Sequence, residues 1–503
     1  MRIHSYGQEV IGRLHQSFEE HGLVYGAAKR YASLLAPASV YLTATELLEL
    51  EADVVALASL YRDTTALYLA SRRGNAPPWI TDAVEHGLSP AQAQANRLVA
   101  EAGFEPMLTR VDYVDVSSDR RQVAEVQWKS GGPGFFYGHE AAYRDVCPIE
   151  PSTAIFGDLA TRYFDTFISA SPEPEIVIVN EARAPWLKAE AHLVEVARTR
   201  GVTYLPLDRS ALSQQLLFGG KQLAVSLGDL TRTVTVLRGR GFTDVLDEAA
   251  ILRIAVDSIE GRTWVEAPLN FIYRQKWNLS LPFLPAFQHL FDARLRSILI
   301  PTTLIVGELI DLTPLAPGFP SEHRDRLVSI TSLHELLRLP ASLRARFVVK
   351  CGAGAGELHN GGHGVFRLGG SKANAATVLN MVRSRVSGCG EPWIIQSYAN
   401  HRYDVPLALP GDNNPVQLVK AHARIMLFAG RAPTNWKLHG AIANFGKSWK
   451  VTGAKAGTGR DGELLGSAFT DVRLEVEPAG HASEAPTLRS SDEPWSGCHE
   501  CCP

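Results

Sequence analysis

Hydrophobic and polar positions follow a helical period in the first part of the chain. Between positions 43 and 63, apolar side chains recur every three or four residues, as they do along one face of a helix. These residues are Leu47, Leu50, Val54, Leu57 and Tyr61. A second helix is predicted to begin at Ser89, a favourable capping residue followed by proline, and to end before Gly103. Residues 1–104 are therefore predicted to form an N-terminal helical region.

A two-residue alternation replaces the helical period after residue 105. The segments 107–116 and 121–128 alternate on either side of a polar turn, which predicts a β-hairpin. Successive side chains of a strand point to opposite sides, so Arg110 and Asp112 share one face of the first strand. By the same rule, Glu125 and Gln127 share one face of the second strand.

The polar face of this hairpin has two interpretations. Two carboxylates and a carboxamide that face together offer the oxygen ligands that magnesium prefers, and a cation would relieve the repulsion between the carboxylates. The glycine-rich residues 130–134 follow directly, and small residues let backbone N–H groups approach an anion. The solvated face of an ordinary hairpin accounts for the same alternation.

The rest of the chain predicts further domains, since 503 residues exceed one compact core. Residues 171–330 have the strand, helix, strand order of an α/β unit. Residues 331–420 predict a helix, the strand ARFVVK, a glycine-rich loop, a helix over 373–386 and the strand PWIIQSY. Further strands are predicted over 421–475, and residues 476–503, rich in Ser, Pro, Glu and Ala, predict a flexible tail.

Two segments of the region 331–420 are typical of anion and base binding. Lys350 ends a β-branched strand directly before a glycine-rich loop, which is a plausible cradle for phosphate oxygens, although no GKS or GKT of a Walker loop occurs. The glycines of that loop are Gly352, Gly354, Gly356, Gly361, Gly362 and Gly364. The apolar strand that ends in Gln396 and Tyr398 could line a base pocket. Taken alone, the glycine-rich segment is a weak signal that a flexible surface loop also explains, and the apolar segment is better explained as a core strand.

Composition narrows the class of protein. Hydrophobic residues at 45% and charged residues at 20% are values of a folded globular protein, and a net charge of -3 gives no general attraction to nucleic acid or to an anionic membrane. The longest apolar stretch, 298–306, is about half the roughly 20 residues of a membrane helix. The first residues lack the apolar region of a secretory signal, and we expect a cytoplasmic protein with reduced thiols.

Taken together, these motifs resemble the ATP-grasp ligases. The strand Arg110-Val-Asp112 is followed thirteen residues later by Glu125-Val-Gln127, Lys350 matches the family's lid lysine, and Ile394-Ile395-Gln396 matches its adenine hinge. Here the acidic strands precede the lid and hinge, which is similar to circularly permuted members such as glutathionylspermidine synthetase-like ligases. Gln127 replaces the usual Asn, and the family's earlier nucleotide lysine has no match before Lys350.

The resemblance implies a fold, an activity and roles for the residues. The fold would be a multidomain α+β or α/β ATP-grasp fold in circularly permuted order, with the N-terminal helical region, the metal-binding hairpin and glycine-rich loop at 105–170, and the lid and hinge at 331–420. With ATP and one or two Mg²⁺ ions, the enzyme would convert a small-molecule or peptide carboxylate to an acyl phosphate for attack by an amine or a thiol. Ligases of this kind often pair, so a homodimer is one state that the resemblance allows. Asp112, Glu125 and Gln127 would hold Mg²⁺, Arg110 the γ-phosphate, Lys350 the earlier phosphates, Gly354, Gly356, Gly361, Gly362 and Gly364 the lid, and Gln396 and Tyr398 the adenine.

Other roles stay open at the C-terminal end of the chain. Arg424, Lys437 and Lys447 could bind a substrate carboxylate or phosphate, or lie on a solvated strand. The chain ends in CHECCP, and Cys498, His499, Cys501 and Cys502 suit a soft metal or thiol chemistry. Two alternatives to a ligase follow: a nucleotide-binding pseudoenzyme of the same fold, and a metal- or thiol-handling protein that acts through this tail.

Overall fold

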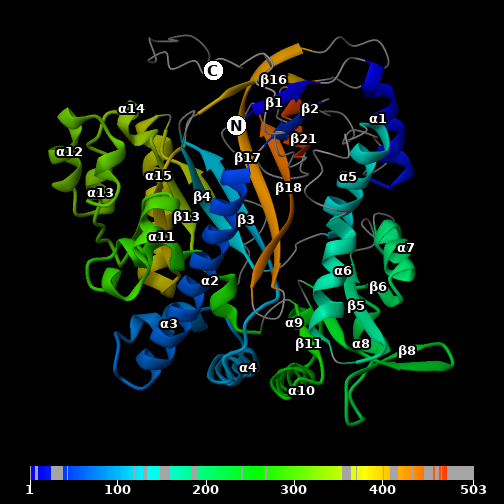
Figure 1. Ribbon diagram of the computed structural model, residues 1–503. Helices are drawn as coiled ribbons and strands as arrows, with labels where there is room; N and C mark the ends of the chain where they lie inside the picture. The colour runs from blue at the N-terminus through cyan, green and yellow to red at the C-terminus, as the bar shows by residue number, and fades with distance from the viewer. Residues whose placement is uncertain are drawn as a thin grey trace.

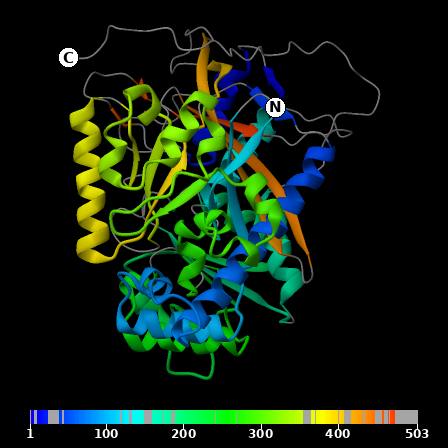
Figure 2. The same cartoon turned by 90° about the vertical axis from the view of Figure 1, so that its left-hand side faces the viewer.

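The computed structural model describes most of the chain, and its sheets and helices are shown in Figures 1 and 2. The described residues are 2–5, 9–23, 38–41, 44–116, 120–128, 133–147, 159–171, 173–182, 187, 190–239, 242–266, 269–353, 364–369, 371–399, 401–407, 417–431, 435–446, 457–458, 464–465 and 467–472. The CHECCP tail, Lys447 and Gly354, Gly356, Gly361 and Gly362 of the expected lid lie outside them.

An antiparallel sheet of order β21-β18-β17-β3-β4 forms the centre of the molecule, and β16 also pairs with β17. Its strands are β3 (Leu108–Asp115), β4 (Arg121–Gln127), β16 (Tyr403–Leu407), β17 (Gln417–Arg431), β18 (Trp436–Gly446) and β21 (Ser467–Val472). The hairpin predicted from alternation is β3–β4, and its register places Arg110 opposite Gln127 and Asp112 opposite Glu125. Since directly opposed side chains share a face, these four lie on one face of the sheet.

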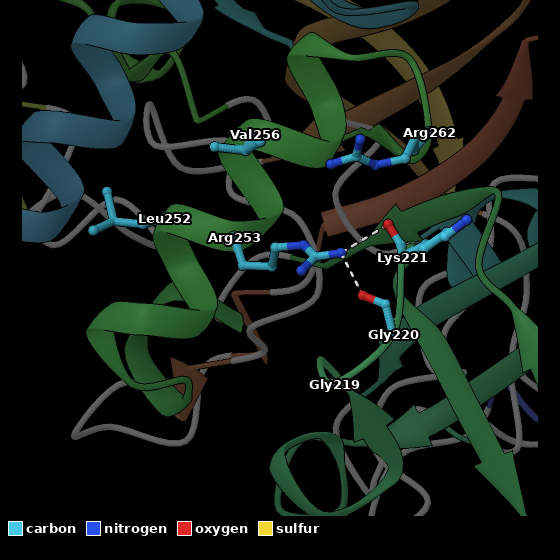
Figure 3. A pocket seen from close by; sticks show the side chains of 7 residues that line it. All are labelled: Gly219, Gly220, Lys221, Leu252, Arg253, Val256 and Arg262. Atoms are coloured by element: carbon cyan, nitrogen blue, oxygen red, sulfur yellow. Dashed lines mark hydrogen bonds between the residues drawn. The ribbon is translucent and has the colours of Figure 1, made fainter.

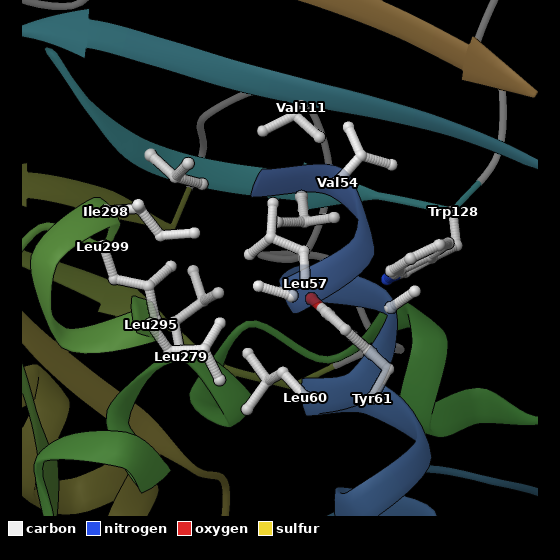
Figure 4. Packing of buried hydrophobic residues seen from close by; sticks show 14 of the residues in the cluster. Val54, Leu57, Leu60, Tyr61, Val111, Trp128, Leu279, Leu295, Ile298 and Leu299 are labelled. Atoms are coloured by element: carbon white, nitrogen blue, oxygen red, sulfur yellow. The ribbon is translucent and has the colours of Figure 1, made fainter. Parts of the chain in front are cut away.

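The other face of the central sheet packs against α2 (Ala44–Arg72), the helix predicted from the apolar period. Val54, Leu57 and Tyr61 are fully buried against Val111 and Trp128 (Figure 4). The Tyr61 and Trp128 rings meet edge to face, with centroids 5.0 Å apart. Each such side chain contributes about 1.5 to 3 kcal/mol by leaving water, so this interface fixes which face of the hairpin is left for polar residues.

Helices cover the β17–β18 part of the polar face. α5 (Pro133–Val146) and α6 (Leu159–Ala170) pack Tyr137 and Tyr163 against Phe428 and Met426, and α1 (Glu9–Glu20) packs outside α5. Proline at 133 suits the first position of a helix. The glycine-rich stretch expected to be a loop up to residue 134 therefore already belongs to α5 from Pro133 onward.

A second antiparallel sheet, of order β12-β15-β13-β14, lies beside β4. Its strands are β12 (Thr302–Ile305), β13 (Phe347–Cys351), β14 (Val365–Arg367) and β15 (Trp393–Ser397). One face packs against α15 (Lys372–Cys389), which begins at the Ser371 cap and ends at Gly390 in the left-handed conformation. Lys350 and Gln396 belong to the opposite face, because their strand neighbours Val349 and Ile395 point into the α15 core.

The third sheet is parallel and has the order β11-β10-β5-β6. It corresponds to the α/β unit that the strand, helix, strand pattern predicts within residues 171–330. It contains β5 (Ile176–Ala182), β6 (Val202–Asp208), β10 (Val236–Arg238) and β11 (Trp264–Val265), with α7 (Ala191–Thr199) between β5 and β6. α4 (Pro90–Glu101) and α10 (Glu248–Ile259) pack Val99, Ile251 and Ile254 against it. α4 begins after Ser89 as predicted, and Ser89 forms a capping box with Gln92.

Short elements complete the described part of the chain. They are β1 (Arg2–Ser5), β2 (Ala38–Tyr41), α3 (Trp79–Glu85), α8 (Leu212–Gln215), β7 (Leu216–Leu217), β8 (Ala224–Leu227), β9 (Leu230–Thr233), α9 (Phe242–Val245), η2 (Phe271–Arg274), η3 (Trp277–Phe283), η4 (Gln288–Leu290), α11 (Ala293–Ile298), η5 (Ala316–Gly318), α12 (Ser321–Val328), α13 (Leu333–Leu336), α14 (Ala341–Arg344), β19 (Gly457–Thr458) and β20 (Leu464–Leu465). The pairing of β1 with β2 corrects the expectation that residues 1–104 are helical throughout. None of the helices in the described ranges combines the length and the apolarity needed to cross a bilayer.

Candidate active site

A bulge in the β3–β4 hairpin forms one wall of the candidate site. Asp112 lies opposite Glu125, but the next residue, Tyr113, lies opposite Val123. Ala124 is therefore left unpaired, as one residue is in a β-bulge. Its carbonyl oxygen accepts a hydrogen bond of 3.2 Å from Lys350 Nζ. The lysine of the second sheet thus reaches the acidic hairpin of the central sheet.

Asp112 is fully buried and is held by two arginines. Its carboxylate accepts hydrogen bonds of 2.9 and 3.1 Å from Arg110 Nε and Nη2, in the bidentate geometry of strong arginine–carboxylate pairs. Arg424, on β17, also donates to Asp112. The same Arg424 nitrogen lies 3.5 Å from Glu125 Oε2. Arg424 therefore contacts both carboxylates of the hairpin.

The cations around Glu125 favour its charged form. Lys276 Nζ lies 3.3 Å from Glu125 Oε1, and the Gln127 amide donates to the same oxygen at 3.1 Å. Burial acts to raise the pKa of Glu125, but the positive charges of Lys276, Arg424, Lys350 and Arg110 outweigh burial and hold that pKa well below its usual value.

Two lysines lie in the site, although the sequence pointed to Lys350 alone. Burial lowers the pKa of Lys350 to about 8 against the opposing effect of Glu125. Lys276, between η2 and η3, joins the site because its backbone N–H donates to Gly352 at 2.9 Å. A Cβ at Gly352 would lie 3.0 Å from a backbone oxygen and from Trp277 Cβ, so a larger residue here would have to displace its neighbours. A lone lysine outside any motif gave no signal in the sequence.

The described side chains of the site carry an excess of positive charge. Four cations, Arg110, Lys276, Lys350 and Arg424, converge on two carboxylates, Asp112 and Glu125. Four positive charges against two negative charges give these six side chains a net charge of two positive charges. Guanidinium and ammonium groups at a partly buried site bind phosphate or carboxylate oxygens strongly, because water screens the charges less there. The site is therefore suited to a polyanion.

The expected magnesium ligands do not fit the metal in this arrangement. Every oxygen of Asp112 and Glu125 is already contacted by a protein donor, and the Gln127 amide donates to Glu125 rather than facing a common centre. Within the described ranges, no three His, Cys, Asp or Glu side chains come together as a metal site would require. The repulsion that suggested a metal is relieved by the protein's own cations.

The residues expected to bind adenine lie farther along the second sheet. Gln396 is 1% exposed and donates to Thr302 Oγ1 at 2.9 Å, so its side chain is a partner within the sheet. Tyr398 has the guanidinium carbon of Arg367 4.1 Å from its ring centroid. Its hydroxyl lies 3.1 Å from His422 Nε2 on β17. Tyr398 therefore lies where the second and central sheets meet.

Two arginines, Arg367 and Arg402, accompany Tyr398. Neither Arg367 nor Arg402 lies within ion-pair distance of a carboxylate among the described residues, and Arg402 Nε is 3.3 Å from His422 Nε2. Burial first, and then the charge of Arg402, lowers the pKa of His422 to about 4, so that this histidine is neutral at pH 7. This end of the inter-sheet region is also electropositive.

The other candidate positions have less to do with this site. Gly364, the described glycine among the expected lid residues, accepts a hydrogen bond of 2.8 Å from the Cys351 N–H and so ends the loop against β13. Lys437 is 60% exposed and lies 3.8 Å from Glu51, in a surface ion pair that contributes little. Of the two described basic residues suggested near the C-terminal end, Arg424 and Lys437, it is Arg424 that lies beside the acidic hairpin.

A second buried polar cluster lies in the parallel sheet. The chain runs from β5 to β6 on one side and returns to β10 on the other, and ligands of such sheets bind at this reversal, beyond the carboxyl ends of the strands. Asn180 ends the buried part of β5, and its side chain accepts from Arg238 Nη1 at 3.4 Å. Arg238 also pairs with Glu266. Tyr204, on β6, donates to Glu190 at 2.7 Å.

A pocket of ≈ 660 Å³ lies elsewhere on the surface, between α10 and the β7–β8 connection (Figure 3). Arg253 Nη2 donates to the carbonyls of Gly220 and Lys221, each at 2.8 Å. Arg253 and Arg262 both pair with the buried Asp257. Their guanidinium groups therefore hold the pocket wall together, and this pocket has no link to the hairpin.

Comparison with known proteins identifies the fold. No family model and no curated protein matches the sequence. Among solved structures, the chain is similar to a glutathione synthetase-like effector from Globodera pallida in its apo form, with 11% sequence identity and a TM-score of 0.53 over 93% of this chain and 96% of that chain. At this identity the likeness shows the fold alone: the chain has a mixed α/β fold similar to that of this glutathione synthetase-like effector.

Proposed function

We propose that this protein is an ATP-dependent ligase of the circularly permuted ATP-grasp type, which joins a carboxylate to an amine. The observation that supports it most strongly is the convergence of Lys350, Lys276, Arg110 and Arg424 in a partly buried site between two sheets. A triphosphate is the polyanion that such a site would take. The glutathione synthetase-like fold adds to this inference.

The reaction would proceed in two displacements. A carboxylate oxygen of the substrate attacks the γ-phosphorus as the bond from that phosphorus to the bridging oxygen of ADP breaks. The amine nitrogen then attacks the carbonyl carbon of the acyl phosphate, phosphate leaves, and the proton of the amine passes to solvent. The protein's task is to orient the reactants and to stabilise the negative charge on the transferred group.

The cations of the site would divide this task. Lys350 and Lys276, beside the start of the glycine-rich loop, would contact the phosphates that stay on ADP. Arg110 and Arg424 would contact the transferred group, where a fixed guanidinium stabilises developing charge without reorganisation. Asp112 and Glu125 would keep these cations in position through the contacts described above. The polar cluster of Asn180, Arg238 and Tyr204 is the candidate site for the second substrate.

The test is ADP release in the presence of pools of carboxylic acids and amines. We expect release that requires both pools and that is lost in Lys350→Met. Lys437→Met, which changes an exposed lysine outside the site, serves as the matched control and should keep full activity. ADP release that needs neither pool would contradict the ligase proposal.

Binding of nucleotide without turnover is the second candidate function. The contact of Arg424 with both carboxylates favours it, because a conventional ATP-grasp reaction uses these carboxylates for metal. Under this proposal, ATP binds with a Kd that Lys350→Met raises, while no acid and amine pair gives ADP. A metal- or thiol-related role of the CHECCP tail stays a prediction, tested by zinc content with and without residues 477–503.

A further inference from the structure

Arg424 lies where a cation between the two carboxylates of the hairpin would have to lie. Its Nη2 contacts Asp112 and is 3.5 Å from Glu125 Oε2, and its side chain is 17% exposed. On β17, Arg424 lies opposite Val114, two positions along the strand from the partner of Asp112. A long side chain at that position can lie along the sheet and reach the hairpin.

The remaining carboxylate oxygens are also engaged. Asp112 Oδ1 accepts from Arg110 Nε at 2.9 Å. Glu125 Oε1 accepts from Gln127 at 3.1 Å and lies 3.3 Å from Lys276 Nζ. A divalent ion that entered this set would have to break at least one contact to each carboxylate and would meet the positive charges of the cluster at short range.

An arginine differs from a lysine as an occupant of this position. A lysine can lose its proton when a second cation approaches, whereas the guanidinium of Arg424 stays charged at every pH at which the protein is folded. A metal ion that binds here must therefore displace the whole Arg424 side chain, because the guanidinium does not lose its proton. Carboxylate pairs held by arginine are stable without metal, and the repulsion that would favour metal binding is absent.

We infer that Arg424 is the resident cation of the Asp112–Glu125 pair and keeps divalent metal out of that position. Asp112 and Glu125, which were expected to bind a metal ion, are instead bridged by the guanidinium of Arg424. Nucleotide phosphates that enter the site would meet Arg424 directly. This inference concerns the protein without nucleotide and does not depend on the proposed ligase activity.

The test is direct binding of Mn²⁺ in the absence of nucleotide and substrate. The amount of free ion is measured by electron paramagnetic resonance. The wild-type chain is expected to show no stoichiometric Mn²⁺ site. Arg424→Met, which keeps the length of the side chain and removes its charge, is expected to gain one Mn²⁺ site about tenfold or more tighter than any wild-type binding. Arg424→Lys, which keeps the charge, should gain less.

Mn²⁺ binding by a double variant and by the wild-type protein decides whether a gained site belongs to the hairpin. Glu125→Gln added to Arg424→Met should remove the new site, which assigns it to the hairpin. One Mn²⁺ bound per wild-type chain and lost in Glu125→Gln would overturn the inference, whatever the stability of the Arg424 variants. A folded Arg424→Met, shown by an unchanged circular dichroism spectrum, that gains no Mn²⁺ would also overturn it. Absence of ADP release bears on the ligase proposal alone.

Discussion

Lys350 Nζ lies 3.2 Å from the carbonyl oxygen of Ala124, a residue 226 positions earlier in the chain. The β-bulge leaves Ala124 without a partner on β3, so its carbonyl is not used in the hairpin ladder. Lys350 belongs to the second sheet and Ala124 to the central sheet. This hydrogen bond therefore joins the two halves of the candidate site, and it holds the lysine among the carboxylates and the other cations.

Lys350 is expected to contribute strongly to nucleotide binding. A charge-assisted hydrogen bond to a phosphate is worth about 1.5 to 3 kcal/mol, so Lys350→Met should weaken the binding of ADP by about tenfold to a hundredfold. Isothermal titration calorimetry measures the change, with Lys437→Met as the control that should bind like the wild type. Equal affinities of the Lys350→Met and wild-type chains would show that the nucleotide does not occupy this site.

The charge of Lys350 also predicts a pH dependence. Burial lowers the pKa of Lys350 to about 8, so the ammonium group loses its proton as the pH rises from 7 to 9. ADP binding should weaken over that interval, because an uncharged amine attracts phosphate less. In Lys350→Met this part of the pH dependence should disappear. Calorimetric titrations at pH 7, 8 and 9 measure it, and a Kd that does not change with pH would contradict it.

The local parts of the site could be predicted from the sequence. Two-residue alternation put Arg110 and Asp112 on one face, and the β-branched run before Lys350 marked its strand, because both follow from the geometry of a single strand. The sequence names Arg424 as a general candidate for a substrate carboxylate or phosphate, and it gives no signal for Lys276. The contacts of these two side chains with Asp112 and Glu125 depend on the packing of segments that are distant in sequence. Those contacts relieve the repulsion between the carboxylates, so the carboxylates need no metal. The one-residue bulge at Ala124 likewise depends on the tertiary structure.

Glu125→Gln should separate anion binding from metal binding. The substitution removes one of two negative charges next to Lys276 and Arg424, so the excess positive charge of the site increases. ADP should then bind more tightly in the presence of a chelator, while the free energy of unfolding falls by about 1 to 3 kcal/mol because buried cations lose a partner. Calorimetry and urea denaturation measure the two changes. If the Glu125→Gln chain instead binds ADP more weakly than the wild type, and no concentration of added metal restores its affinity, Glu125 is a magnesium ligand.

Two buried histidines should make the protein less stable in mild acid. Burial lowers the pKa of His139 and of His439 to about 3, whereas an unfolded histidine takes up a proton near pH 6.5. As the pH falls from 6.5 toward 3, the unfolded chain therefore gains protons that the folded chain does not, and stability is lost. Each histidine should lower the free energy of unfolding by about 2 to 3 kcal/mol at pH 4.5.

The histidine prediction is measured by urea denaturation at pH 7.0 and pH 4.5. His439→Gln keeps a polar side chain beside Thr166, whose hydroxyl lies 3.1 Å from His439 Nε2. This variant should lose less stability between the two pH values than the wild type loses. An equal loss in both proteins would mean that His439 is protonated in the folded state.

Gly430 should tolerate no larger residue, because β17 passes very close to two polar side chains there. A Cβ at this position would lie 2.3 Å from His439 Nε2 and 2.5 Å from Thr166 Oγ1, both well inside contact distance. Gly430→Ala should therefore lower the free energy of unfolding by about 1 to 3 kcal/mol. Gly388→Ala is the matched control: nothing lies within 4 Å of its Cβ position in α15, and alanine there should add about 0.5 to 1 kcal/mol through helix propensity. Chemical denaturation of the two variants tests the pair, and a Gly430→Ala protein as stable as Gly388→Ala would mean that β17 lies farther from α6 than these contacts require.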